Sequence, residues 1–205
     1  MQKIELLHEI VEKDRTIAVA AHETLDYFFV LFADALIERR IRFELADGAR
    51  ANVRGVLLGN ATADITLETD MVHRGKNTEG FTTVKGILTD RARARVTGWI
   101  RIPETGNNTN AFLEQRFLLL SKTARAKAEP MLEILANDVK ASHAASVSRL
   151  NDEQIFYAES RGLDPDESRH LLTEAFINEI VQKIPDRAIS VQCEKQLSKF
   201  LTPNP

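Results

Sequence analysis

Short runs of alternating apolar and polar residues, separated by turns, are the feature of this chain that most limits its fold. Alternation with a period of two is typical of β-strands, because successive side chains point to opposite faces of a sheet. Turn-forming pairs such as Asp47-Gly48, Gly59-Asn60 and Asp90-Arg91 separate the runs. Many short, evenly spaced strands predict a sandwich, a barrel or a solenoid. The alternating apolar positions are Ile41, Phe43, Leu45, Ile65, Leu67, Met71, Val96, Ile100, Ile102, Phe117, Leu119, Leu132 and Ile134.

A weak internal repeat favours the solenoid. Residues 49–52, 92–95 and 124–127 read Ala-Arg-Ala-Asn, Ala-Arg-Ala-Arg and Ala-Arg-Ala-Lys. Stacked coils need similar residues at each corner. In this repeat, Ala would keep the bend narrow and Arg would point to water. The alternative is that three such matches arise by chance in an Ala- and Arg-rich chain, which would leave the sandwich and the barrel open.

The period changes to that of a helix after Leu150. We predict helices over residues 151–161, 164–184 and 186–201. The apolar face of the second would consist of Leu172, Ala175, Phe176, Ile180 and Val181. The helix signals are the caps Asn151 and Asp164, Gln154 and Glu167 three residues after them, Pro165 at a first helical position, Gly162 as a stop, and the Ile184-Pro185 step.

Composition limits the compartment and the partners. With 28% charged and 43% hydrophobic residues, the chain is typical of a soluble globular protein. A formal charge of -3 supplies no basic field for nucleic acid. The most apolar stretch, residues 25–37, is interrupted by Asp26 and Asp34 and is too short to span a membrane. A single cysteine, Cys193, excludes an intrachain disulfide and fits a reducing, cytoplasmic location.

From about Arg40 to Val181 the chain resembles the core domain shared by the SufB and SufD proteins, and it is closer to SufD. This resemblance implies a mainly β fold, a right-handed parallel β-helix followed by a small C-terminal helical region. Residues 1–150 would form the β-helix core, with 1–40 as N-terminal rungs or a cap, and 151–205 the helical region. The matching segments include Phe43-Glu44-Leu45-Ala46, Gly98-Trp99-Ile100-Arg101-Ile102, Pro130-Met131-Leu132-Glu133-Ile134, Asp138-Val139-Lys140-Ala141-Ser142-His143 and Ser160-Arg161-Gly162-Leu163.

The resemblance also implies a function, that of a scaffold or accessory subunit in SUF iron–sulfur cluster assembly rather than an enzyme. Such a subunit would pair through its β-helix with a SufB-like subunit or a second copy of itself. It would dock a SufC-like ABC ATPase through the C-terminal helices, where Phe156, Tyr157, Arg161 and Phe176 are the docking candidates. An iron–sulfur cluster would be bound transiently, with the partner. The chain has no GxxxxGK[ST] loop, so we expect it to bind no nucleotide.

His143 is the main candidate for cluster assembly and for binding a metal. It matches the histidine of a Cys-Ser-His-Gly motif in SufD, which the resemblance places at the pairing interface. Imidazole suits iron and accepts a proton near neutral pH. A structural histidine on the last rung is the alternative. Weaker interface candidates are Gln115, Ala141 and Ala144, which stand where family members carry Cys, Cys and Glu.

Two other functions stay open. The missing cysteines are compatible with a degenerate structural paralogue that performs no cluster chemistry. A β-solenoid enzyme acting on a small molecule would need clustered carboxylates. The acidic residues Glu44, Asp64, Glu68 and Asp70 are expected on different strands, without a paired motif. We expect Cys193 to be a small buried hydrophobe and His73 to pack against a neighbouring rung.

Overall fold

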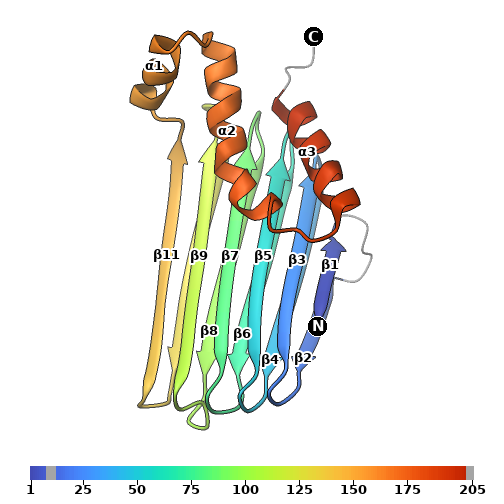
Figure 1. Ribbon diagram of the computed structural model, residues 1–205, viewed down its shortest axis with the longest axis vertical. Helices are drawn as coiled ribbons and strands as arrows, with labels where there is room; N and C mark the ends of the chain where they lie inside the picture. The colour runs from blue at the N-terminus through green and yellow to red at the C-terminus, as the bar shows by residue number, and fades with distance from the viewer. Residues whose placement is uncertain (8–12, 202–205) are drawn as a thin grey trace.

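The computed structural model describes residues 1–7 and 13–201, which form a run of β-strands followed by three helices (Figure 1). Residues 1–40, expected to supply rungs or a cap, contain three strands and the start of a fourth. The elements are β1 (Gln2–Leu6), β2 (Asp14–Val19), β3 (Thr24–Ala33), β4 (Leu36–Leu45), β5 (Arg50–Gly59), β6 (Asp64–His73), β7 (Glu79–Leu88), β8 (Arg93–Ile102), β9 (Thr109–Leu119), β10 (Arg125–Ile134), β11 (Val139–Arg149), α1 (Asp152–Ser160), α2 (Pro165–Val181) and α3 (Arg187–Leu201).

The strands form two sheets between which the chain alternates. One sheet has the order β1-β3-β5-β7-β9-β11 and the other the order β10-β8-β6-β4-β2. Each strand pairs in parallel with the strand two further along the chain, as β5 does with β7. This connectivity is that of a parallel β-solenoid and confirms the prediction over the sandwich and the barrel, which lack such stacked coils.

The repeated Ala-Arg-Ala segments lie at corners of the coils. Ala49, Ala92 and Ala124 immediately precede β5, β8 and β10, and each of these three side chains is fully buried. The arginine that follows each of them is exposed. The structure therefore agrees with the prediction that Ala fills the narrow bend and Arg faces water.

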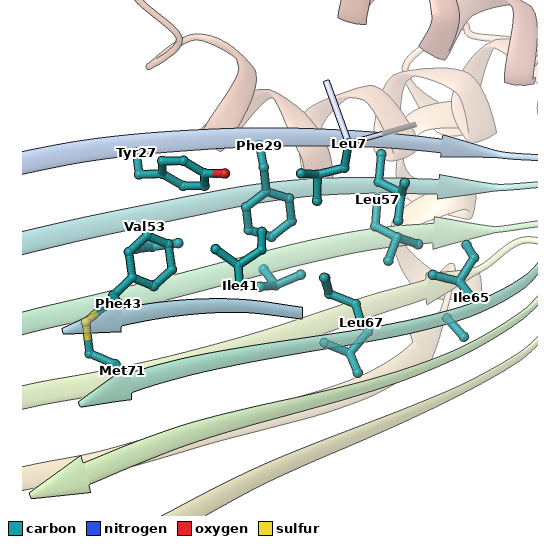
Figure 2. Packing of buried hydrophobic residues seen from close by; sticks show 14 of the residues in the cluster. Leu7, Tyr27, Phe29, Ile41, Phe43, Val53, Leu57, Ile65, Leu67 and Met71 are labelled. Carbon is teal, nitrogen blue, oxygen red and sulfur yellow. The ribbon is translucent and has the colours of Figure 1, made fainter. Parts of the chain in front are cut away.

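The core lies between the two sheets and consists of side chains at alternate strand positions (Figure 2). Tyr27 and Phe43 meet edge to face across it, with ring centroids 5.1 Å apart. Phe29 covers Gly55 so closely that a Cβ at Gly55 would overlap the ring. Gly86 and Phe117 are related in the same way. Glycine is therefore needed where an aromatic ring packs directly against the backbone of the neighbouring strand.

Helices α2 and α3 cover the outer face of the six-stranded sheet (Figure 1). The predicted apolar face of α2 is right for Ile180 and Val181, which are buried. It is wrong for Ala175, which is exposed, and it missed Ile177, because the helix is rotated so that Ile177 meets the sheet. Within the described residues, no helix is both long and apolar enough to cross a membrane.

The helix caps follow the sequence signals closely. The Asp164 side chain accepts hydrogen bonds from the Asp166 and Glu167 amides at 2.8 Å, and Glu167 reaches back to the Asp164 amide. Asn151 caps α1, and Gly162, with φ of 97°, follows its end. Helix α2 ends at Val181, before the predicted stop at Ile184, so the sequence overestimated its length.

Candidate functional site

The solenoid has an open end at β10 and β11. Within the described residues, β10 pairs only with β8, and β11 only with β9, so each strand has one free backbone edge. Their side chains are mostly exposed, whereas those of the preceding coils are buried. We call the inner faces and free edges of β10 and β11 the open end. The large apolar side chains exposed on the inner faces of these two strands are Leu132, Ile134 and Val147.

His143 lies near the middle of β11, on the inner face of the open end. Its parallel partner in β9 is Leu113, which points into the core and is 1% exposed. Paired residues of parallel strands point to the same face, so the imidazole stacks over Leu113. No further strand of the described chain covers it, and His143 is exposed. The ring is therefore available to a second molecule.

Gln115 lies one coil beneath His143 and is completely buried. Its partner in β11 is Ala145, so only a methyl group lies above it at the open end. The amide fits because Gly98 opposite has no side chain: a Cβ there would lie 2.8 Å from the Gln115 Nε2. Neither amide atom has a hydrogen-bond partner among the described residues. An unpartnered buried polar group costs about 1–3 kcal/mol, which makes Gln115 unusual in this apolar interior.

The two alanine candidates lie on opposite faces of β11. Ala141 stacks over Ala111 on the inner face and packs beside Ile100 and Ile102. Ala144 occupies the alternate, outer face. The structure thus brings Ala141, His143 and Gln115 together at the open end and separates Ala144 from them. Neither methyl group can bind a metal, and among the four candidates the His143 imidazole is the side chain best suited to iron.

His73 and Cys193, the other two residues considered from the sequence, are both buried. The His73 ring is hydrogen-bonded to the Thr78 hydroxyl at 2.8 Å, and burial lowers the pKa of His73 to about 4. Burial raises the pKa of Cys193 to about 11. Its thiol packs in the cluster beneath α2 and α3, as the sequence predicted for a buried hydrophobe. Both groups are thus kept neutral at physiological pH.

The acidic residues considered for an enzyme are arranged differently from the prediction. Asp64, Glu68 and Asp70 share one strand, β6, and do not lie on different strands. Burial raises the pKa of Asp70, although Arg101 at 3.1 Å and Arg42 at 3.3 Å oppose the shift. Glu68 pairs with Arg40. Glu68 and Asp70 thus belong to a ladder of ion pairs across the outer face of the five-stranded sheet.

Helix α1 exposes two aromatic side chains. Phe156 is 71% exposed and Tyr157 is 61% exposed. Arg161, one turn further on, donates a hydrogen bond to the Tyr157 hydroxyl at 3.0 Å and lies over its ring. Large aromatic side chains with this exposure beside a cation are typical of surfaces that bind another protein. Three of the four docking candidates thus form one exposed group.

Phe176, the fourth docking candidate, is instead half-buried between α2 and the six-stranded sheet. The Lys85 Nζ lies 4.9 Å from the centre of its ring and donates a hydrogen bond to the Phe176 carbonyl at 2.9 Å. Lys85 also pairs with Glu179. The sequence analysis did not identify Lys85, because a single lysine among the apolar residues of β7 does not indicate which residues it contacts. Phe176 and Lys85 attach α2 to the sheet.

The two sheets of parallel strands and the C-terminal helices that follow them define a class, the β-solenoid proteins with a helical C-terminal region. The comparison with protein families names it more closely. The model of the family "SUF system FeS cluster assembly, SufBD core domain" matches residues 10–176. The chain belongs to this family.

Individual relatives agree with the assignment. The chain is 33% identical over 146 residues to the iron–sulfur cluster assembly protein SufD of Bacillus subtilis, which covers 71% of this chain and 33% of the relative. It is 36% identical over 117 residues to SufD of Escherichia coli, which covers 57% of this chain and 28% of the relative. A SufBD family protein of Synechocystis is 42% identical over 101 residues, 49% of this chain and 22% of the relative. The chain thus spans a third or less of the length of these relatives.

Proposed function

We propose that this chain is a scaffold or accessory subunit of SUF iron–sulfur cluster assembly, joined to another subunit at the open end. The observation that carries the proposal is an exposed histidine on an exposed apolar end of the solenoid. Unpaired strand edges and apolar side chains are both costly to leave in water, and a second chain would satisfy both. His143 would then lie within the interface.

The cluster chemistry must be shared with the partner. Iron–sulfur clusters are held mainly by cysteine thiolates, and the one cysteine of this chain, Cys193, is buried as a thiol away from His143. His143 would contribute one imidazole to iron during assembly, while the partner supplies the thiolates. The iron and sulfur are the cargo of this process, bound transiently.

The C-terminal helices would dock an ABC-type ATPase through Phe156, Tyr157 and Arg161. Hydrolysis takes place on that partner, since this chain carries no phosphate-binding loop of the GxxxxGK[ST] type. A single cysteine and a formal charge of -3 support a reducing compartment, the cytoplasm, and a protein partner rather than nucleic acid.

Copurification tests the docking surface. The double variant Phe156→Ser, Tyr157→Ser should lose the ATPase, because both rings are exposed and would be buried against it. The matched control is Leu36→Ser. Leu36 is 76% exposed, much like Phe156, but it lies on β4 of the five-stranded sheet and not on the C-terminal helices. Retention of the ATPase by the double variant would contradict this part of the proposal.

Complementation of a strain without the endogenous subunit tests His143. His143→Ala should leave the melting temperature unchanged, because the ring is exposed, and should abolish growth that depends on cluster assembly. Ser142→Ala, an exposed neighbour on the outer face of the same strand, is the control. Full growth with His143→Ala would reject the role of the imidazole.

A structural paralogue without cluster chemistry is a second candidate, favoured by the lack of any exposed thiol. Such a subunit would pair and dock as above but leave the cluster to its partner. Anaerobic reconstitution separates the two: complexes with wild-type chain and with His143→Ala would bind equal amounts of iron and sulfide if the chain is purely structural.

A further inference from the structure

The two Ala-Arg-Ala repeats of the five-stranded sheet lie side by side in consecutive coils. β10 pairs with β8 in a register that sets Arg125 beside Arg93 and Lys127 beside Arg95. Paired residues of parallel strands point to the same face, and the alanines between these four residues pack against the core. All four charged side chains are exposed on the outer face of the sheet. We call Arg93, Arg95, Arg125 and Lys127 the cationic array.

One carboxylate serves two of the cations in the array. The Glu129 carboxylate lies 2.5 Å from the Lys127 Nζ and 4.0 Å from the Arg95 Nη1. The side chains of Lys127 and Arg95 remain 61% and 62% exposed, so both charges are accessible to a second molecule. Glu129 compensates for only one of these two positive charges.

The other two cations, Arg93 and Arg125, have no counter-ion within the described part of the chain. The Arg125 guanidinium donates hydrogen bonds to two backbone carbonyls at 2.7 and 2.8 Å, which leave its charge in place. Asp64 of β6 is in register with Arg93, but these two side chains, both described by the structure, form no ion pair. Neighbouring strands are about 4.8 Å apart, so two like charges lie side by side, which destabilises a sheet.

The rest of this outer face is arranged differently, because cations on one strand lie beside carboxylates on the next. The ion pairs of 2.8 to 3.3 Å there are Arg40–Glu68, Arg42–Asp70, Arg101–Asp70 and Arg74–Glu44. The sheet can therefore hold charges of alternating sign. Like charges stacked on β8 and β10 lower the stability of the folded chain, and such local conflicts are typical of functional surfaces.

Charge and shape select the kind of partner. The array attracts an anion, whereas the chain as a whole has a formal charge of -3. The basic surface is therefore small, which disfavours a long nucleic acid or a membrane, since both need a broad basic field. The array also lies on the face of a sheet, whereas sites for small molecules are concave. A short acidic segment of a protein fits both conditions.

The spacing of the array fits an extended segment. Residues two apart along a strand are about 6.6 Å apart, and this is the separation of Arg93 from Arg95 and of Arg125 from Lys127. An extended peptide that runs along β8 and β10 repeats its side chains with the same period. Acidic residues at every second position would therefore each meet a cation.

We propose that the cationic array binds a short, extended acidic segment of a further protein partner. This inference goes beyond the proposed function, which assigns partners to the open end and to α1. The array lies on the outer face of the five-stranded sheet, whereas α2 and α3 cover the outer face of the six-stranded sheet (Figure 1). The acidic segment therefore binds on the side of the solenoid opposite α2 and α3.

Fluorescence anisotropy with a labelled peptide of alternating Glu and Ser tests the proposal. The wild-type chain should bind this peptide at low ionic strength, and added salt should weaken the binding. The double variant Arg93→Gln, Arg125→Gln should bind at least about tenfold more weakly. A wild-type chain that does not bind the peptide would overturn the proposal.

The matched control is the double variant Arg40→Gln, Arg74→Gln. It removes the same number of charges from exposed arginines of the same sheet, but carboxylates already compensate for these two. Its affinity for the Glu-Ser peptide should stay within about twofold of the wild type. Equal losses of affinity in the two double variants would overturn the proposal, because overall charge alone would then explain the binding.

Competition tests the class of partner. A single-stranded oligonucleotide of matched charge and vesicles that contain phosphatidylserine should displace the labelled peptide less readily than the unlabelled peptide does. Stronger displacement by either would overturn the assignment to an acidic protein segment. Arg93→Gln, Arg125→Gln should also copurify with the ATPase as the wild type does, and loss of the ATPase would contradict a further partner.

Thermal unfolding gives a readout that needs no partner. Arg93→Gln removes the repulsion from Arg125, so the thermal midpoint should stay the same or rise. Arg40→Gln breaks the ion pair with Glu68 and should lower the midpoint slightly. A larger fall with Arg93→Gln than with Arg40→Gln would show that Arg93 stabilises the fold, and would contradict the assignment of the array to binding.

Discussion

The attachment of α2 to the sheet allows a quantitative prediction. Lys85 is 3% exposed and carries its charge beneath α2, where it bonds to the Phe176 carbonyl and to Glu179. The Glu179 side chain is 52% exposed and keeps much of its contact with water. The two partners are therefore unequal: removal of Glu179 leaves a buried charge without a counter-ion, whereas removal of Lys85 leaves an exposed carboxylate that water solvates.

Glu179→Ala should accordingly cost more stability than Lys85→Met. Breaking a fully buried ion pair costs about 3–5 kcal/mol, and the exposure of Glu179 reduces the expected loss to about 2 kcal/mol. Lys85→Met keeps the stem packed and removes the charge, so it should cost about 1 kcal/mol or less. The double variant should resemble Lys85→Met alone, because no buried charge is left unpaired.

Urea denaturation of the four proteins of this cycle measures the free energies of unfolding. A loss with Lys85→Met that equals or exceeds the loss with Glu179→Ala would refute the reasoning.

The dependence of stability on pH gives a second readout. The hydrogen bond from Lys85 lowers the pKa of Glu179 below its usual value of 4.5, so this stabilisation is complete above pH 4.5 and is lost as the pH falls further. Lys85→Met should remove that dependence.

Three further changes have defined outcomes. Gly86→Ala should destabilise the protein by about 1–3 kcal/mol in urea denaturation, because a Cβ would overlap the Phe117 ring; an unchanged midpoint would contradict the packing. His73 has its pKa lowered from 6.5 to about 4, so the unfolded chain takes up a proton first and stability should fall by up to about 3 kcal/mol as the pH drops through this window. His73→Gln should flatten the stability curve there, and an unaltered curve would show that another group titrates. Asp164→Ala should cost about 1 kcal/mol by removing the cap of α2, measured as a shift in thermal midpoint, whereas Asp166→Ala beside it should cost less.

The sequence predicted the solenoid because its signals are local and repeated. Ala49, Ala92 and Ala124 mark corners wherever they occur, and the capping box at Asp164 needs only neighbours in the chain. The face of α2 could not be predicted in the same way. Ala175 and Ile177 are both apolar, and which of them meets the sheet is decided by the docking of the helix, a tertiary property.

The open end illustrates the same limit. Leu132 and Ile134 alternate as core residues do, and only the position of β10 in the last coil leaves them exposed. His143 was identified through a family resemblance, whereas its place on the inner face of an edge strand follows from the register with Leu113. The lysine of β7 gave no interpretable signal, because its partners lie on α2, more than ninety residues away.

The central claim is that the imidazole at the open end takes part in cluster assembly between subunits. Anaerobic reconstitution of the complete complex, followed by iron and sulfide analysis, tests it most directly. The wild-type complex should bind a cluster, and the complex with His143→Ala should assemble with the same stoichiometry of subunits yet bind little iron or sulfide. Equal iron and sulfide in the two complexes would contradict the claim.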